Sequence, residues 1–271
     1  MIHILLSTYN GERYLSEQLD SIIAQTVADW RLFVRDDGST DTTVQLLEKY
    51  AKADRRIRLI TDGENIGACR SFERLLTQCG EADYYAFADQ DDVWKPEKLA
   101  VCLDQMHRQE HIYPAKPIVV HTDLQVVDEH LHEIAPSFWR YSNIRSELVD
   151  ANLRYLAICN SVTGCAMFFN RAARETALPF RETAYMHDAW VALSTAAAGG
   201  KVIPLSATPI AYRQHQTNVL GAVPYTLWGK TWAQRKADAQ RSYTMAHPLV
   251  FANKAQFLLW KIIYFIHRQC A

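Results

Sequence analysis

Residues 84–94 read Tyr-Tyr-Ala-Phe-Ala-Asp-Gln-Asp-Asp-Val-Trp, and this stretch decides how the rest of the chain is interpreted. Its first half, Tyr84 to Ala88, is a short apolar run rich in aromatic residues, which is typical of a buried strand. The run ends in three carboxylates, Asp89, Asp91 and Asp92. Like charges so close together repel one another, whereas a hard divalent cation would neutralise them and bridge them to substrate phosphates. A solvated acidic turn is the alternative, and these residues alone do not decide between the two.

The segments before this stretch alternate between two hydrophobic patterns. Short apolar runs at 2–6, 30–34, 57–60 and 84–88 predict strands, and the segments between them carry apolar residues at helical spacing. Such alternation is typical of βαβ units, so the sequence predicts an α/β fold with a mostly parallel central sheet flanked by helices.

Three polar segments follow these predicted strands directly: Ser7–Gly11, Asp36–Asp41 and Asp89–Asp92. Ligands of open α/β sheets bind outside the carboxyl ends of the strands, so we expect the three segments to form one site. The chain has neither a Gly-x-Gly-x-x-Gly turn after the first strand nor a Walker loop. A phosphate-bearing ligand would therefore be held mainly through a metal ion.

Composition limits the class of protein. The chain has 271 residues, 49% of them hydrophobic, which is enough for a large core, and its formal net charge of −1 suggests no nucleic-acid partner. The six cysteines form no Cys-x-x-Cys pair, and the amino terminus has no basic signal region, so we expect a cytoplasmic protein.

In this order, the motifs Ser7–Gly11, Asp36–Asp41 and Asp89–Asp92 resemble family 2 of the inverting, nucleotide-sugar-dependent glycosyltransferases, which have the GT-A fold. They are most similar to bacterial rhamnosyltransferase-like members that build O-antigen, capsule and other surface polysaccharides. The resemblance covers about the first 220 residues. It implies a Rossmann-like GT-A domain over residues 1–222, with a nucleotide-binding half to about 116 and an acceptor half beyond it. Residues 223–271 would form a helical extension.

The resemblance also implies the residues that bind the donor. Either Asp36 or Asp37 would accept a hydrogen bond from the imide N–H of uracil or thymine, and spacing does not choose between them. The whole nucleotide-sugar site would comprise Thr8, Tyr9, Glu12, Asp36, Asp37, Asn65, Gly67, Arg70, Asp89 and Gln90. Mg²⁺ or Mn²⁺ would be held by Asp89, Asp91 and His215.

In the second half of the chain, the resemblance assigns the catalytic base to Asp188, which would deprotonate the acceptor hydroxyl. His187 would share this work or hold Asp188 in place. Without the resemblance, an Asp in the first turn of a helix is ordinarily a favourable dipole interaction. The donor and acceptor sugars would contact Trp94, Gly164, Cys165, His187, Trp190 and Arg213. Residues 162–169 predict a strand, and a core position for Cys165 or a solvated loop around Arg213 are the alternatives.

The tail from Tyr225 onward is helical in pattern, with seven Lys or Arg residues and one acid, Asp238. The apolar run at 257–266 is too short to span a bilayer. A basic helix with tryptophan can lie at a membrane surface, so we expect peripheral attachment to the inner face of the cytoplasmic membrane. Packing of the tail on the enzyme, or a homodimer, is the alternative.

Together these features predict a metal-dependent inverting glycosyltransferase. It would move a single sugar, L-rhamnose from dTDP-rhamnose or a hexose from a UDP-sugar, onto a glycan or lipid-linked oligosaccharide acceptor. Single addition is favoured because the Gln-x-x-Arg-Trp motif of processive synthases is missing. A nucleotidyltransferase acting on a sugar phosphate and a non-catalytic glycan-binding module are the rival classes.

Overall fold

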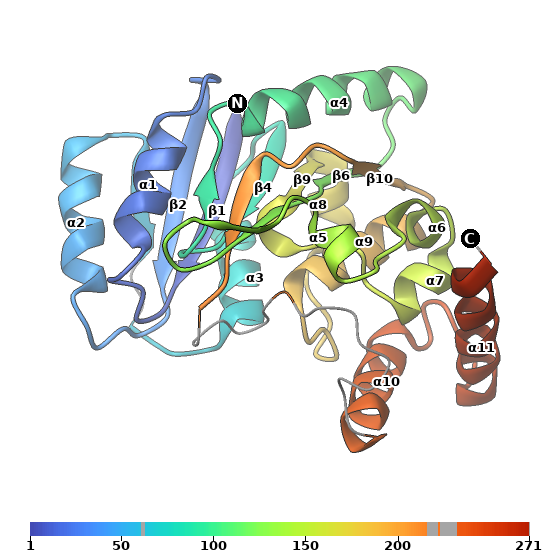
Figure 1. The fold of residues 1–271 in the computed structure, drawn as a ribbon. Helices are drawn as coiled ribbons and strands as arrows, with labels where there is room; N and C mark the ends of the chain where they lie inside the picture. The colour runs from blue at the N-terminus through green and yellow to red at the C-terminus, as the bar shows by residue number, and fades with distance from the viewer. Residues whose placement is uncertain (61–62, 216–221, 223–231, 271) are drawn as a thin grey trace.

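A computed structural model describes residues 1–60, 63–215, 222 and 232–270 of the chain. Its centre is a mixed seven-stranded sheet in the order β10-β6-β9-β4-β1-β2-β3 (Figure 1). All neighbouring pairs are parallel except those that β9 makes with β4 and β6. The strands are β1 (Ile2–Thr8), β2 (Trp30–Asp36), β3 (Ile57–Ile60), β4 (Tyr84–Ala88), β6 (Ile118–Thr122), β9 (Met167–Asn170) and β10 (Lys201–Leu205). The predicted mostly parallel α/β sheet is confirmed.

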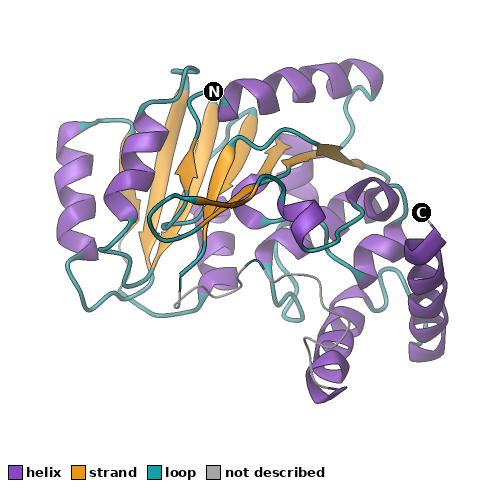
Figure 2. Cartoon of the chain, in the orientation of Figure 1, coloured by secondary structure: helices purple, strands orange, loops and turns teal. Residues whose placement is uncertain are grey.

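Successive side chains along each strand point to opposite faces of the sheet, and a hydrophobic layer lies on each face. Along β1, Ile4 and Leu6 point to one layer and Leu5 to the other, as the period of a strand requires. Three helices cover the first face: α1 (Leu15–Ile23), α2 (Thr43–Ala53) and α4 (Lys98–Ile112). The second face is covered by α3 (Ala68–Gln78), α7 (Leu153–Ile158), α8 (Arg171–Ala177) and α9 (His187–Ala197) (Figure 2).

A second, four-stranded sheet lies beside the carboxyl ends of the central strands. Its order is β5-β11-β7-β8, and its strands are β5 (Val93–Trp94), β7 (Gln125–Val127), β8 (Glu133–Ala135) and β11 (Ile210–Arg213). In this sheet β5, which follows the acidic cluster, pairs with β11, which leads into His215. The small sheet therefore brings residues far apart in the sequence to one end of the central sheet.

The segment between β8 and β9 contains three short helices, although the sequence predicted no regular structure there. It forms α5 (Phe138–Tyr141), α6 (Ser146–Asp150) and α7. The strand predicted over 162–169 begins later than expected, because Gly164–Ala166 forms a turn of 3₁₀ helix before β9. The turn places Gly164 and Cys165 next to the end of β4 instead of within the sheet.

The tail contains two helices, α10 (Trp232–Ala246) and α11 (Lys254–Cys270), which extend from the body beyond α7 (Figure 1). One side of each helix joins the hydrophobic layer beneath α7, through Met245, Phe257 and Tyr264. Residues 223–231, including the tryptophan at 228, lie outside the described residues, as does the side chain of Trp232.

Candidate active site

The three loops predicted to meet do so, because β2, β1 and β4 are neighbours in the sheet. The amide and carbonyl of Tyr9 bond the carboxamide of Gln90 at 2.9 and 3.0 Å. The amide of Asn10 donates to Ser39 Oγ at 2.8 Å. Gly11 permits this close approach, since a Cβ there would lie 2.3 Å from Gln90 Oε1.

The two consecutive carboxylates after β2 have different surroundings. Both oxygens of Asp36 accept two hydrogen bonds each, from Thr8 and Ser39 at Oδ1 and from the amides of Gly38 and Ser39 at Oδ2. Its four acceptor positions are thus filled by the protein.

Asp37 is buried and belongs to a network that holds the loop before α3. Its Oδ1 accepts from Arg35 at 2.6 Å, Ser71 at 3.0 Å and the Ile66 amide at 2.8 Å, whereas the Gly67 amide bonds Oδ2 at 2.9 Å. Burial alone would raise the pKa of Asp37, but these hydrogen bonds outweigh it and hold the pKa below its usual value.

The acidic cluster after β4 divides into an inner and an outer part. One ligand atom from each of Asp89, Asp92 and Cys165 lies within 4.8 Å of the others. Asp92 is fully buried, and its Oδ1 accepts from the Arg213 amide at 3.1 Å. Burial, together with the charges of Asp91 and Asp188, raises the pKa of Asp89 to about 7. A bound cation would stabilise the charged form of carboxylates this close together, because it offsets their mutual repulsion.

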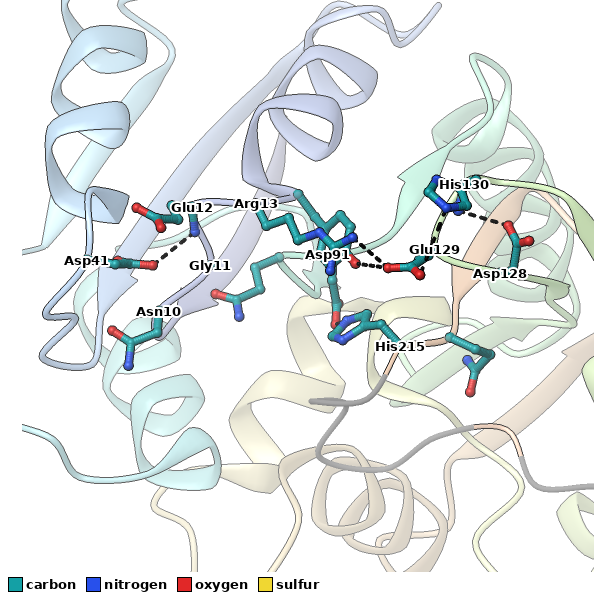
Figure 3. Close-up of a pocket in the computed structure, with 13 residues that line it drawn as sticks. Asn10, Gly11, Glu12, Arg13, Asp41, Asp91, Asp128, Glu129, His130 and His215 are labelled. Atoms are coloured by element: carbon teal, nitrogen blue, oxygen red, sulfur yellow. Dashed lines mark hydrogen bonds and ion pairs between the residues drawn. The ribbon is translucent and has the colours of Figure 1, made fainter.

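Asp91 points outward, toward the loop after β11. Its Oδ2 lies 2.8 Å from His215 Nε2, and both residues line a cavity of about 960 Å³ (Figure 3). At this distance the two side chains contact each other directly, which leaves no space for a cation between them. A carboxylate oxygen and an imidazole nitrogen are nevertheless both atoms that can coordinate a divalent cation at the mouth of the cavity. Of the predicted metal ligands, Asp91 and His215 therefore form one pair, and Asp89 stands with the inner cluster.

Asp188, the predicted base, lies in the first turn of α9 and is 6% exposed. Its Oδ1 accepts from the Ala189 amide at 2.6 Å, and the Gly164 amide also donates to the carboxylate. Burial raises the pKa of Asp188 to about 6, and these hydrogen bonds offset part of the rise. Gly164 joins Asp188 to the acidic cluster, because the next residue, Cys165, has its sulfur within 4.8 Å of an Asp89 oxygen. The charge of Asp188 is also one of the causes that raise the pKa of Asp89.

His187 is a packing residue in this structure. Its ring stacks on Phe72 at 3.9 Å between centroids and meets the edge of Phe87. Neither ring nitrogen has a hydrogen-bond partner among the described residues, and burial lowers the pKa of His187 to about 3. The ring also needs a glycine opposite it, since a Cβ on Gly164 would lie 2.7 Å from Nε2. The histidine thus makes no bond that would hold Asp188.

The two tryptophans predicted to contact sugars are instead in the core. Trp94 is 2% exposed, and Lys98 Nζ lies over its ring, 3.6 Å from the ring centre. Trp190 is 4% exposed, and its Nε1 donates to the Ala177 carbonyl at 2.8 Å. Both side chains are therefore buried in the protein.

Arg213, predicted to face sugars or phosphates, is also buried. Its guanidinium donates to the carbonyls of Asp91 and Glu129 at 2.8 and 2.7 Å, pairs with Glu17, and lies over the Tyr14 ring. The arginine therefore holds the backbone of the acidic cluster in place.

Of the remaining predicted residues, Glu12 lies at the cavity, whereas Asn65 and Arg70 do not line it. Glu12 lines the cavity and accepts from the Thr42 amide at 2.9 Å. Asn65 lies against Gly38, in the loop tied to Asp37. Arg70 pairs with Glu73 at 2.6 Å and lines a separate groove of about 380 Å³ along α3.

Sequence reasoning missed the far wall of the cavity, which is the β7–β8 turn with Asp128, Glu129 and His130. Arg13 Nη2 reaches Glu129 Oε2 across the cavity at 2.5 Å (Figure 3). Only polar character marks this turn in the sequence. Its place at the site depends on pairing between β7 and β11.

Comparison with known proteins identifies the class of this site. Residues 3–176 match the sequence profile described as glycosyl transferase family 2. An uncharacterized glycosyltransferase of Haemophilus influenzae is 28% identical over 164 residues, which cover 59% of this chain and 50% of that protein. The dTDP-rhamnosyl transferase RfbG of Shigella flexneri is 38% identical over 103 residues, which cover 36% of each protein. The chain thus spans half the length of the first relative and about a third of the second.

Solved structures agree in fold. Mannosyltransferase PcManGT from Pyrobaculum calidifontis, in complex with GDP-Man and Mn²⁺, has a TM-score of 0.61 at 17% identity, covering 97% of this chain and 64% of that one. S. aureus TarS 1–349 in complex with UDP-GlcNAc has a TM-score of 0.58 at 17% identity, covering 80% and 59%. The predicted GT-A-type fold is confirmed by these likenesses.

Proposed function

This chain belongs to glycosyl transferase family 2, and from that premise we propose that it transfers one sugar from a nucleotide-sugar donor to a glycan or lipid-linked acceptor. The observation that carries the proposal is the position of Asp188 beside Asp89. A buried carboxylate with a pKa near 6 is suited to accept a proton at neutral pH. No glycan-binding module would need such a base next to an acidic cluster.

In the proposed reaction, Asp188 takes the proton of the acceptor hydroxyl while that oxygen attacks the anomeric carbon of the donor. The bond from this carbon to the diphosphate breaks on the opposite side, which inverts the configuration. A divalent cation, when bound, would offset the charge that develops on the departing diphosphate. Asp91 and His215 would hold it at the cavity, with Asp89 behind them.

For the base of the donor, we favour Asp37 over Asp36. The protein fills all four acceptor positions of Asp36, whereas among the described residues a single hydrogen bond, from the Gly67 amide, reaches Asp37 Oδ2. A carboxylate oxygen can accept two, so Asp37 retains room for an imide N–H. Thr8 ends β1 and is buried, with its hydroxyl on Asp36, whereas the exposed Tyr9 that follows it would pack against the nucleoside.

The donor is proposed as a dTDP- or UDP-sugar, and the pathway as surface polysaccharide synthesis. RfbG, a dTDP-rhamnosyl transferase by name, is 38% identical to this chain over the 103 residues that match, which makes dTDP-L-rhamnose the first donor to test.

A donor panel tests the proposal. The full chain is incubated with Mn²⁺ and each of dTDP-L-rhamnose, UDP-glucose, UDP-GlcNAc and GDP-mannose, and release of the nucleoside diphosphate is measured. We expect one donor to raise the melting temperature and to be hydrolysed slowly in a metal-dependent way, with hydrolysis lost in Asp188→Asn. Binding of nucleoside triphosphates with pyrophosphate release would instead support a nucleotidyltransferase and overturn the proposal.

A further inference from the structure

Helix α11 carries a continuous apolar face that is open to solvent. Its exposed large side chains are between 47% and 59% accessible and comprise Leu258, Leu259, Ile262, Phe265 and Ile266. They recur at helical spacing, so they share one side of the helix. The opposite side, with Phe257 and Tyr264, packs into the core next to α7.

This concentration is unusual within the described part of the chain. The other exposed large hydrophobic side chains there are spread over several elements, at Met1, Tyr9, Ile112, Leu131, Ile134 and Tyr185. Single exposed apolar residues are normal on a protein surface, whereas a contiguous patch marks an interaction site. Of the aromatic residues in α11, Phe265 belongs to the exposed apolar face, whereas Phe257 and Tyr264 are buried and Trp260 is half-buried.

Basic residues border the apolar face. Lys254, Lys261 and Arg268 follow one another at intervals of seven residues, in one row between the apolar face and the body of the protein. Lys254 is exposed, whereas Lys261 is half-buried and Arg268 donates to the Asn143 carbonyl at 2.6 Å. Helix α10 adds Arg235, Lys236 and Arg241, all exposed, and its single acid, Asp238, pairs with Arg241 at 2.6 Å. An apolar face with a basic border complements a surface that is apolar inside and negatively charged outside.

We propose that this face of α11 lies in the interface of a bilayer containing anionic phospholipid. The apolar side chains enter the region between headgroups and acyl chains, and the exposed cations Arg235, Lys236 and Lys254 lie among the headgroups. A second copy of the chain fits less well, because it would bring two basic surfaces together. Within the described part of the chain, no helix combines the length and the apolar character that a bilayer span requires.

Helix α10 also contacts the segment that precedes α9. Arg241 of α10 lies 5.8 Å from the ring centre of Tyr185, and Tyr185 is three residues before Asp188. The inference itself rests only on α10 and α11, so it stands or falls independently of the transfer reaction.

Flotation of the full chain with vesicles tests the inference. Vesicles of phosphatidylcholine with about a third phosphatidylglycerol are compared with phosphatidylcholine alone, and we expect binding mainly to the anionic set. The double variant Ile262→Glu/Phe265→Glu should reduce that binding by about tenfold or more, since both side chains enter the interface. The matched control is Ile112→Glu, because Ile112 is 58% exposed and Ile262 is 59% exposed. This control should float like the wild type.

A second variant, Lys236→Gln/Lys254→Gln, removes two exposed charges and so separates charge from apolar burial. It should weaken binding to anionic vesicles about tenfold or more, because each basic residue near such a surface contributes about a factor of five. Far-UV circular dichroism and donor hydrolysis without vesicles should be unchanged in all these variants, which shows that folding and the active site are intact. Equal flotation of wild type and Ile262→Glu/Phe265→Glu would overturn the inference. So would a wild-type dimer in light scattering that this variant converts to monomers while neither binds vesicles.

Discussion

Asp91 and His215 are 124 residues apart in the sequence, yet Asp91 Oδ2 and His215 Nε2 lie 2.8 Å from each other at the edge of the cavity. The loop after β4 supplies the carboxylate and the segment after β11 supplies the imidazole. Pairing of β5 with β11 brings these segments together, and Arg213 ties them by donating to the Asp91 carbonyl. The geometry of this pair therefore depends on the small sheet.

Replacement of His215 by Ala should weaken Mn²⁺-dependent nucleotide binding by about tenfold to a hundredfold. Asp91→Asn should do the same, and the double variant should lose little more, because both residues would act on one ion. Calorimetric titration of the nucleotide with and without Mn²⁺ measures the effect. His130→Ala, in the far wall of the same cavity, is the control that should retain metal dependence. Additive losses in the double variant would contradict a shared ion.

Asp188→Asn should lower kcat by about 10²–10⁴-fold while leaving nucleotide affinity nearly unchanged. In the wild type, kcat/KM should fall as the pH is lowered through about 6, because the base works only when deprotonated. The residual rate of the variant should lack this dependence. Initial rates between pH 5 and 8 measure both, and full activity of the variant would remove the assignment of the base.

The same substitution should make the folded protein more stable at pH 8. Burial raises the pKa of Asp188 from 3.8 to about 6, so the folded state holds a proton more tightly than the unfolded state does. The free energy of unfolding of the wild type therefore decreases as the pH rises through this window, by up to about 3 kcal/mol. The asparagine side chain carries no charge and escapes this loss. Urea unfolding should show the gain at pH 8 and little difference at pH 4.

Asp37→Asn should destabilise the fold by about 3–5 kcal/mol at neutral pH, because it breaks the buried ion pair between Asp37 and the Arg35 guanidinium. Since the pKa of Asp37 is lowered, its contribution is present above the unfolded value and is lost as the pH falls through the folded value. Asp36→Asn is the matched control, with an expected cost of about 1–3 kcal/mol. If Asp37→Asn weakened nucleotide binding without any loss of stability, its network would be of no structural importance.

Trp190→Ala should cost about 3–5 kcal/mol of stability with little change in the KM of either substrate. Its ring fills the core between Phe180 and the Ala177 carbonyl and does not reach the cavity. Tyr9→Ala provides the contrast, since Tyr9 is 49% exposed on the loop after β1. This variant should keep its melting temperature and lose nucleotide affinity. A large increase in KM in Trp190→Ala at unchanged stability would instead show that Trp190 contacts a sugar.

The sequence by itself determined the order of strands and helices in the first hundred residues and the meeting of three polar loops. These features depend on hydrophobic period and on the parallel arrangement of strands, and both can be read from neighbouring residues. The family resemblance added Asp188, which no local pattern distinguishes from an ordinary residue in the first turn of a helix.

Only the tertiary structure decided which way the side chains point. Trp94, Trp190, His187 and Arg213 are residues typical of binding sites, yet packing between distant elements buries them. The same packing places the β7–β8 turn opposite Arg13 and leaves one face of α11 exposed to solvent. His187 and Arg213, for example, are buried by contacts with Phe72 and Glu17, more than a hundred residues away, and the local sequence carries no record of those contacts.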